Sequence, residues 1–191
     1  MKQAMAVSVL CVLFALGNQL RAATLPDACG DDKTQFDVKT EKHQPAPTPP
    51  TVGMAQIVFV GLVDAGPGGC IGCGTFSPRV GIDGSWVGAT KGNSYFSVEL
   101  DPGEHHLCAV WKSLLATKGK NVGVTSFNAE AGKVYYFQVR IREVEGGVMG
   151  PSGGPVSSTY DWVLDLTQLS EDEGRYQMKI SALATSRLRK Q

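Results

Sequence analysis

The chain has 191 residues, which favours one domain, and 42 % of them are hydrophobic, enough for a core. Eighteen basic and eighteen acidic side chains cancel, so the chain lacks the basic excess typical of a nucleic-acid-binding surface. The 23 glycines and 10 prolines are typical of a turn-rich β protein rather than a helical one. We therefore expect a mostly β fold and no nucleic-acid partner.

Residues 1–22 have the pattern of a cleavable signal peptide. Lys2 provides a positive start, residues 4–16 form an uncharged apolar run, and residues 17–22 are more polar. The apolar run is too short to cross a bilayer as a helix, which needs ~20 residues. We expect cleavage after Ala22, export to the periplasm or the exterior, and no stable membrane span afterwards. A buried N-terminal core helix is the alternative.

Residues 23–53 are expected to form an N-terminal arm and a proline-rich spacer. Within them, residues 35–40 alternate between polar and apolar side chains, as a short strand does. Residues 45–50 contain four prolines. Because proline fixes φ and has no N–H to donate, this run predicts an extended polyproline-type segment.

Residues 54–185 are expected to form a single β-sandwich domain. The run 55–63 is continuously apolar, which is typical of a strand buried on both faces. Turn signals then recur about every eight to twelve residues, as in a sandwich or a small barrel. Further strands are predicted at 79–82, 85–89, 94–100, 105–111, 122–128, 134–142 and 162–166, with turns at 83–84, 92–93, 101–103 and 131–132.

The C-terminal part of the chain carries a loop, a helix and a tail. Residues 146–154 are rich in glycine and are predicted to form a flexible loop. Ser170 followed by Glu173 has the spacing of a capping box, which predicts one short helix whose length Gly174 limits. Residues 186–191 are predicted to be a frayed basic tail.

Four sequence features occur in an order found in a known family. They are an apolar strand with an Asp-Gly turn (80–84), a Gly-x-Ser-Tyr-Phe strand (92–96), a Pro-Gly turn (100–105) and an Ala-Gly-Lys-x-Tyr-Tyr segment (131–136). Over residues 55–181 the chain thereby resembles the exported bacterial domain-of-unknown-function family 2846, and more distantly the PEGA-type surface β-domains. The resemblance implies an immunoglobulin-like or PEGA-like β-sandwich outside the cytoplasm, and it carries no activity with it.

The cysteines favour disulfides. With Cys11 inside the signal peptide, Cys29, Cys70, Cys73 and Cys108 remain, an even number that is typical of disulfide pairing in an oxidising compartment. These four cysteines can pair in three ways. We favour a bond that ties the arm through Cys29 to the domain, because closing so long a loop contributes ~3–4 kcal/mol in the chain-entropy model.

A metal-binding or thiol-redox module is the alternative function. Cys70 and Cys73 have the spacing of zinc ligands, and the segment from His105 to Cys108 could complete the set, with His106 and Cys108 on one strand face. Redox dithiols lie at helix N-termini, whereas Cys70 and Cys73 stand in a glycine-rich loop between strands, which argues against redox catalysis.

No catalytic pattern is visible in the sequence. It contains no nucleophile elbow, phosphate-binding loop or His-Glu-x-x-His zinc helix. The favoured hypothesis is a non-enzymatic envelope or secreted protein without a cofactor, which binds a protein or an envelope polymer; an envelope hydrolase with an unrecognised site is a further hypothesis. Aromatic residues are expected mostly in the core, with one or two in an exposed binding patch: Trp86, Tyr95, Phe96, Trp111, Tyr135, Tyr136 and Trp162.

Overall fold

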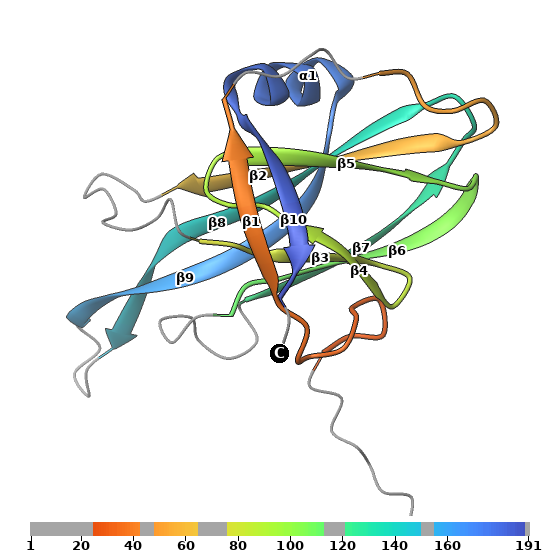
Figure 1. Ribbon diagram of the computed structural model, residues 1–191. Helices are drawn as coiled ribbons and strands as arrows, with labels where there is room; N and C mark the ends of the chain where they lie inside the picture. Colours follow the sequence, from red (N-terminus) through yellow and green to blue (C-terminus); the bar gives the residue numbers. More distant parts are fainter. Residues whose placement is uncertain (1–24, 43–47, 65–75, 113–120, 150–154, 190–191) are drawn as a thin grey trace, which may run out of the picture.

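Two β-sheets and one helix make up the computed structural model, which describes residues 25–42, 48–64, 76–112, 121–149 and 155–189 (Figure 1). Within these residues, a six-stranded sheet has the order β1-β10-β5-β2-β8-β9 and a four-stranded sheet the order β4-β3-β6-β7. The elements are β1 (Phe36–Glu41), β2 (Ala55–Asp64), β3 (Arg79–Ile82), β4 (Ser85–Ala89), β5 (Ser94–Leu100), β6 (Gly103–Val110), β7 (Val122–Ala129), β8 (Val134–Met149), β9 (Pro155–Leu169), α1 (Glu171–Ile180) and β10 (Ala182–Leu188). The predicted mostly-β sandwich with one C-terminal helix is confirmed.

Strand β2 runs through the middle of the six-stranded sheet, antiparallel to β5 and parallel to β8. On one face, Ile57 and Phe59 belong to the core between the sheets. On the other face, Val58 and Val60 pack with Met178 of α1. The continuous apolar run therefore forms a strand covered on both faces, as predicted.

Aromatic rings from both sheets meet in the core. Phe59 lies 5.3 Å from Phe96 and 6.3 Å from Phe137, measured between ring centroids. Phe127 of β7 lies 5.1 Å from Phe137 of β8 and so joins the four-stranded sheet to the six-stranded sheet. These spacings are those at which aromatic pairs attract one another.

Three of the predicted turns have different roles in the architecture. Asp83 (φ 48°) and Gly84 (φ 81°) both have positive φ, as a type I′ turn requires, and they join β3 to β4 in a hairpin. In contrast, the turns before Gly103 (φ 140°) and at Gly132 (φ 78°) lead from β5 to β6 and from β7 to β8, and each carries the chain from one sheet to the other. The residues of these turns predict that the chain reverses direction, but not that the next strand joins the other sheet.

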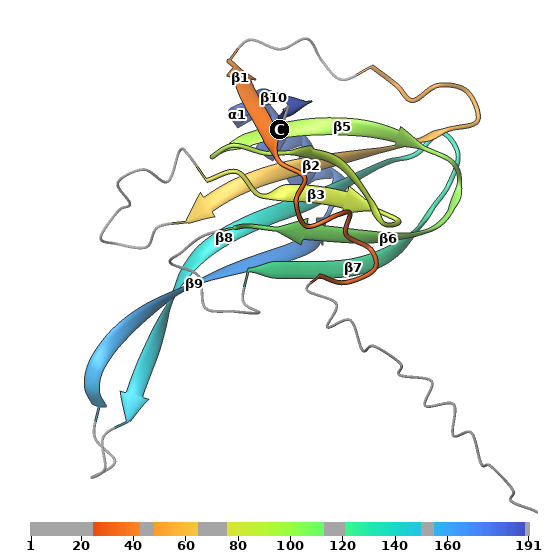
Figure 2. The ribbon, with the colours of Figure 1, turned by 60° about the horizontal axis from the view of Figure 1, so that its bottom comes forward.

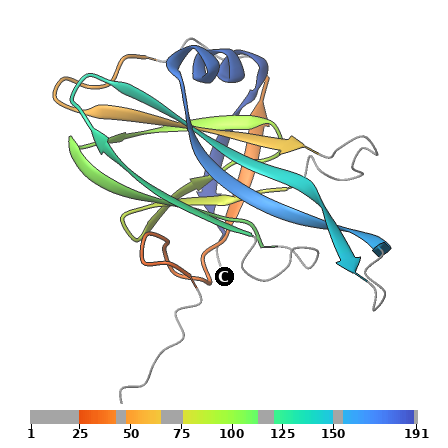
Figure 3. The same ribbon diagram turned by 180° about the vertical axis from the view of Figure 1, so that it is seen from behind.

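Helix α1 lies against the outer face of the six-stranded sheet (Figures 1 and 3). The predicted capping box is present: the Ser170 hydroxyl accepts from the Glu173 N–H, and the Glu173 carboxylate accepts from the Ser170 N–H at 3.2 Å. Gly174 and Met178 are the buried residues of the helix. A Cβ at Gly174 would overlap the ring of Tyr136, so glycine permits the close approach of helix and sheet.

The predicted loop at 146–154 is wrong over residues 146–149. Strands β8 and β9 pair antiparallel from Tyr136 and Leu169 out to Met149 and Pro155, and the hairpin extends past the rest of the sandwich (Figure 2). The ladder satisfies the backbone groups of the glycine-containing segment, and pairing thus outweighs the low strand propensity of glycine. Residues 150–154 lie outside the described residues.

The predicted domain boundary at residue 186 is also wrong, because β10 continues through Leu188. This strand pairs antiparallel with β1, and its first residues pair parallel with β5. Beyond its end, the Arg189 N–H donates to the Gln35 carbonyl at 2.9 Å, and the Arg189 guanidinium binds Asp37. The basic tail and the N-terminal arm therefore stabilise each other as strands of one sheet.

Replacing Gly174 tests the packing of α1. We expect Gly174→Ala to lower the free energy of unfolding by about 1–3 kcal/mol, because the added methyl group would overlap Tyr136. Helix propensity alone predicts the opposite sign, since alanine favours helix over glycine. Urea unfolding followed by circular dichroism measures the change. Lys179→Ala on the exposed side of the helix is the control and should stay within about 0.5 kcal/mol; an increase in stability for Gly174→Ala would contradict this packing.

Candidate functional site

A disulfide holds the N-terminal arm against the domain. Cys29 bonds to Cys108 of β6 across a sequence separation of 79, and both residues are buried. Around the bond, Val110, Trp86 and other apolar residues form a cluster on the outer face of the four-stranded sheet. The predicted bond from Cys29 to the domain is confirmed, whereas Cys70 and Cys73 lie outside the described residues.

Three side chains of the domain hold the arm through its backbone carbonyls. Arg79 donates to the carbonyls of Asp32, at 3.2 Å, and of Thr34. The Lys112 ammonium donates to the same Asp32 carbonyl and lies 3.0 Å from the Asp32 carboxylate. The Trp86 indole N–H donates to the Asp31 carbonyl at 2.6 Å. The arm thereby covers part of the outer face of this sheet, with the carbonyls of Asp31, Asp32 and Thr34 satisfied.

Arg79 is the buried charge of this region. Its side chain is 6 % exposed, and its guanidinium carbon lies 4.3 Å from the centroid of the Trp86 ring, a cation–π distance. Burial lowers the pKa of Arg79, and the carboxylates of Asp32 and Asp31 partly offset that shift. Arginine nevertheless stays charged at neutral pH.

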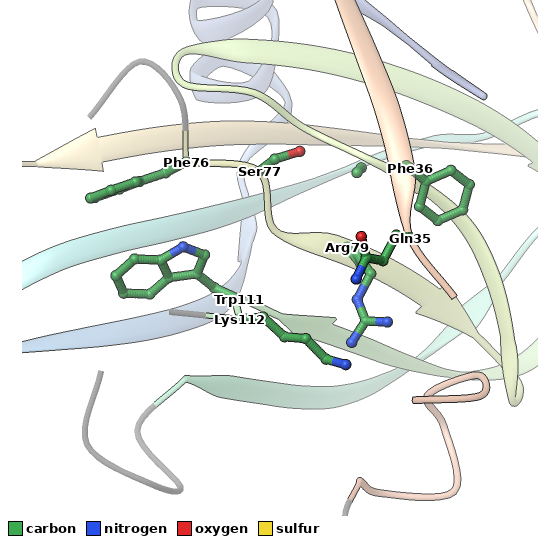
Figure 4. A pocket seen from close by; sticks show the side chains of 8 residues that line it. Gln35, Phe36, Phe76, Ser77, Arg79, Trp111 and Lys112 are labelled. Atoms are coloured by element: carbon green, nitrogen blue, oxygen red, sulfur yellow. The ribbon is translucent and has the colours of Figure 1, made fainter. Parts of the chain in front are cut away.

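A cavity of about 410 Å³ opens between the arm and the domain, beside Arg79. Figure 4 shows the rings of Phe76 and Trp111 on one side and the side chains of Arg79 and Lys112 on another. The lining residues are Gln35, Phe36, Phe76, Ser77, Arg79, Ala89, Trp111 and Lys112. Its volume falls in the range of small-molecule sites, ~300–1,000 Å³. We call this cavity the arm pocket.

The aromatic wall of the arm pocket is fixed by ring contacts. Phe76 lies 4.7 Å from Trp111 and 5.4 Å from Trp162, and the two tryptophans are 6.2 Å apart. Trp111 is buried, while Phe76 keeps part of its surface exposed. The partly exposed ring in this wall is Phe76, which was not among the aromatics expected to form a patch; Trp111 and Trp162 pack against it.

The cationic wall contains an unsatisfied donor. Within the described residues, the buried Arg79 Nη2 atom makes no hydrogen bond, although it forms an ion pair with the Asp32 carboxylate 3.8 Å away. Buried polar groups almost always have a partner, and a guanidinium N–H without one is costly. The described lining residues include no carboxylate that could accept from it. A buried guanidinium N–H group without a hydrogen-bond acceptor among the described residues therefore lies beside the arm pocket.

The predicted metal site at Cys70, Cys73, His106 and Cys108 is wrong in its use of Cys108. His106 and Cys108 share a strand face as expected, but the Cys108 sulfur is bonded to Cys29 and cannot bind a metal as a thiolate. The His106 side chain is 61 % exposed and lies 3.7 Å from Asp83. Among the described residues, no group of three or more His, Cys, Asp or Glu side chains has metal-binding geometry.

His105 forms a half-buried ion pair beside the β3–β4 turn. Its Nδ1 lies 2.7 Å from an Asp83 carboxylate oxygen, and its Nε2 lies 2.8 Å from the Asp101 carbonyl oxygen. Burial lowers the pKa of His105, but the hydrogen bonds and charges of Asp83 and Asp101 outweigh it and raise the pKa above its ordinary value. Burial raises the pKa of Asp83, but the His106 N–H and the His105 ring outweigh it and lower the pKa.

Comparisons of the chain with protein-family models, curated proteins and solved structures give no significant match. The resemblance to family 2846 stays a prediction. The signal peptide and its cleavage after Ala22 lie outside the described residues. No helix in the part of the chain that the structure describes is long and apolar enough to cross a membrane.

Sequence reasoning missed Phe76, Arg79 and Lys112 as site residues. One signal was present, since Arg79 opens a short strand whose other residues are apolar or glycine, and all of that strand is buried. A charged residue in such a strand needs partners. Those partners lie more than forty positions away, in the arm, and no local pattern marks them.

The arm disulfide is expected to contribute strongly to stability. In the chain-entropy model, a loop of this length is worth about 4 kcal/mol, so Cys29→Ser/Cys108→Ser should lower the free energy of unfolding by about that amount. Urea unfolding without a reductant measures it. The control is Cys70→Ser/Cys73→Ser, which leaves the arm bond in place and should cost less. Equal losses in both double variants would contradict a special role for this bond.

The His105–Asp83 pair predicts a window of pH dependence. Protonated His105 stabilises the fold fully below about pH 6.5, and this contribution is lost as the pH rises through its raised pKa. Ionised Asp83 contributes above about pH 3.9, and its contribution is lost as the pH falls through its lowered pKa. The free energy of unfolding of the wild type should therefore exceed that of Asp83→Asn by the largest amount between about pH 4 and 6.5. The difference should stay below about 1 kcal/mol, because Asp83 is 44 % exposed and screened by solvent.

Urea unfolding at pH 5.5, inside the window, and at pH 8, above it, measures this difference. Asparagine tolerates the positive φ at position 83, so the turn should persist in the variant. Asp172→Asn on α1 is the control, and it should show no such change with pH. An Asp83→Asn effect that is the same at pH 5.5 and pH 8 would contradict the assignment.

Proposed function

We propose that this protein is a non-enzymatic, exported β-sandwich that binds a protein or cell-envelope partner through the arm pocket. The observation that carries the proposal is the buried Arg79 donor without a hydrogen-bond partner beside a cavity large enough for a ligand. A fold that leaves such a donor without an acceptor loses stability. A bound ligand that supplies the acceptor would offset this loss.

Two further features support export and binding rather than catalysis. Structural disulfides such as Cys29–Cys108 form and persist mainly in oxidising compartments, in keeping with the predicted signal peptide. The described lining residues of the arm pocket include no histidine, carboxylate or cysteine that could act as a base or nucleophile. Ser77, the hydroxyl group in the lining, donates to the Thr90 carbonyl at 2.8 Å rather than to a base.

Binding of cell-envelope fractions tests the proposal. The whole chain, with its arm disulfide intact, is immobilised and exposed to separated polysaccharide and protein fractions of a bacterial envelope. Phe76→Ala should weaken binding of the active fraction by about tenfold or more, as expected for a central aromatic contact. Tyr176→Ala, an exposed aromatic on α1, is the control and should leave binding unchanged.

Two results would contradict the proposed function. Binding that is unaffected by Phe76→Ala would place the partner elsewhere on the surface. Release of a product from an envelope fraction by wild type, and not by a variant in the arm pocket, would show an enzyme instead.

A further inference from the structure

We infer that the arm pocket binds an acidic sugar unit, whose carboxylate is held by Arg79 and Lys112 and whose ring lies against Phe76. The inference rests on the proposed function and specifies its ligand. It follows from the Arg79 N–H group that lacks a hydrogen-bond acceptor among the described residues, the second cation, and the neighbouring aromatic surface (Figure 4).

The arginine is already oriented for a carboxylate. Its Nη1 donates to two arm carbonyls, those of Asp32 and Thr34, and its guanidinium lies over the ring of Trp86. These contacts fix the plane of the Arg79 guanidinium group before any ligand arrives. Ligand binding therefore costs little side-chain entropy at Arg79. A charge-assisted hydrogen bond from a fixed guanidinium is among the stronger contacts available to a carboxylate.

Lys112 gives the site its second positive charge. Its ammonium reaches the same arm residue as Arg79, since both contact Asp32, and the two cations therefore lie close together. The side chains of Lys112 and Asp32 are each 47 % exposed, and water weakens their attraction. A ligand carboxylate can therefore compete with Asp32 for Lys112 while it lies close to the buried positive charge of Arg79.

Phe76 supplies a surface for the ring of the ligand. The face of an aromatic ring is electron-rich, so it attracts the C–H groups on the apolar side of a sugar ring. Trp111 and Trp162 support Phe76 at ring-contact distance and hold it in place. The cavity volume of about 410 Å³ suits a ligand the size of one or a few sugar units.

Calorimetry with three small probes tests the class of ligand. Sodium glucuronate, glucose and inorganic phosphate are titrated separately into the whole chain at equal ionic strength. We expect glucuronate to bind at least about tenfold more tightly than glucose, because glucose lacks the carboxylate. We also expect glucuronate to bind more tightly than phosphate, because phosphate has no ring to place on Phe76.

Three variants assign the contacts. Lys112→Gln and Phe76→Leu should each weaken glucuronate binding by about fivefold or more, through loss of the charge and of the ring face respectively. Lys133→Gln removes an exposed lysine paired with Glu130 away from the pocket lining, and it should leave binding unchanged. Thermal unfolding of each variant confirms that the fold persists.

Each outcome distinguishes the ligand class from the proposed function. Equal affinity for glucose and glucuronate would overturn the inference that the ligand is an acidic sugar. The proposed function of the arm pocket as a binding site would stand. Phosphate binding that is stronger than glucuronate binding and insensitive to Phe76→Leu would show a bare anion site. Failure of all three probes, with Phe76-dependent binding of an envelope fraction intact, would overturn this inference alone. Failure of that binding as well would overturn both.

Discussion

The structure depends on the attachment of the N-terminal arm to the four-stranded sheet. The Cys29–Cys108 bond and the buried Arg79 side chain fix the arm over the outer face of that sheet and cover Val110 beside the bond. The chain then continues into β1, which pairs with β10 at the other end of the sequence. With α1 over the six-stranded sheet, some of the apolar side chains on the outer face of each sheet are covered. The arm is therefore a structural part of the domain.

The same attachment creates the arm pocket. Gln35 and Phe36 come from the arm, whereas Arg79 and Trp111 come from the domain, so the cavity exists only where the two meet. Arg79 serves both parts: one nitrogen holds the arm carbonyls, and the other makes no hydrogen bond to the described residues beyond its ion pair with Asp32. Natural proteins depart from full satisfaction of buried polar groups mainly at functional sites. In the proposed function, attachment of the arm and binding of the ligand therefore depend on the same side chain.

The sequence predicted the parts of the fold that are encoded locally. The apolar run of β2, the Asp83-Gly84 hairpin and the Ser170 capping box each follow from neighbouring residues, and all three are confirmed. Strand β10 was missed because its strand character comes from pairing with β1, more than 140 positions away, rather than from its own alternation. The arm pocket was missed for the same reason, since Arg79 finds its carbonyl partners far along the chain.

A disulfide map tests the central claim most directly. The whole chain is denatured without a reductant, its free thiols are blocked, and it is digested with trypsin, which cleaves after lysine and arginine. Cys29 then lies in peptide 22–33, or 23–33 after the expected cleavage, Cys108 in peptide 92–112, and Cys70 and Cys73 together in peptide 43–79. Mass spectrometry should find 22–33 linked to 92–112. A link from either of these peptides to 43–79, or a blocked thiol at Cys29, would contradict the arm attachment.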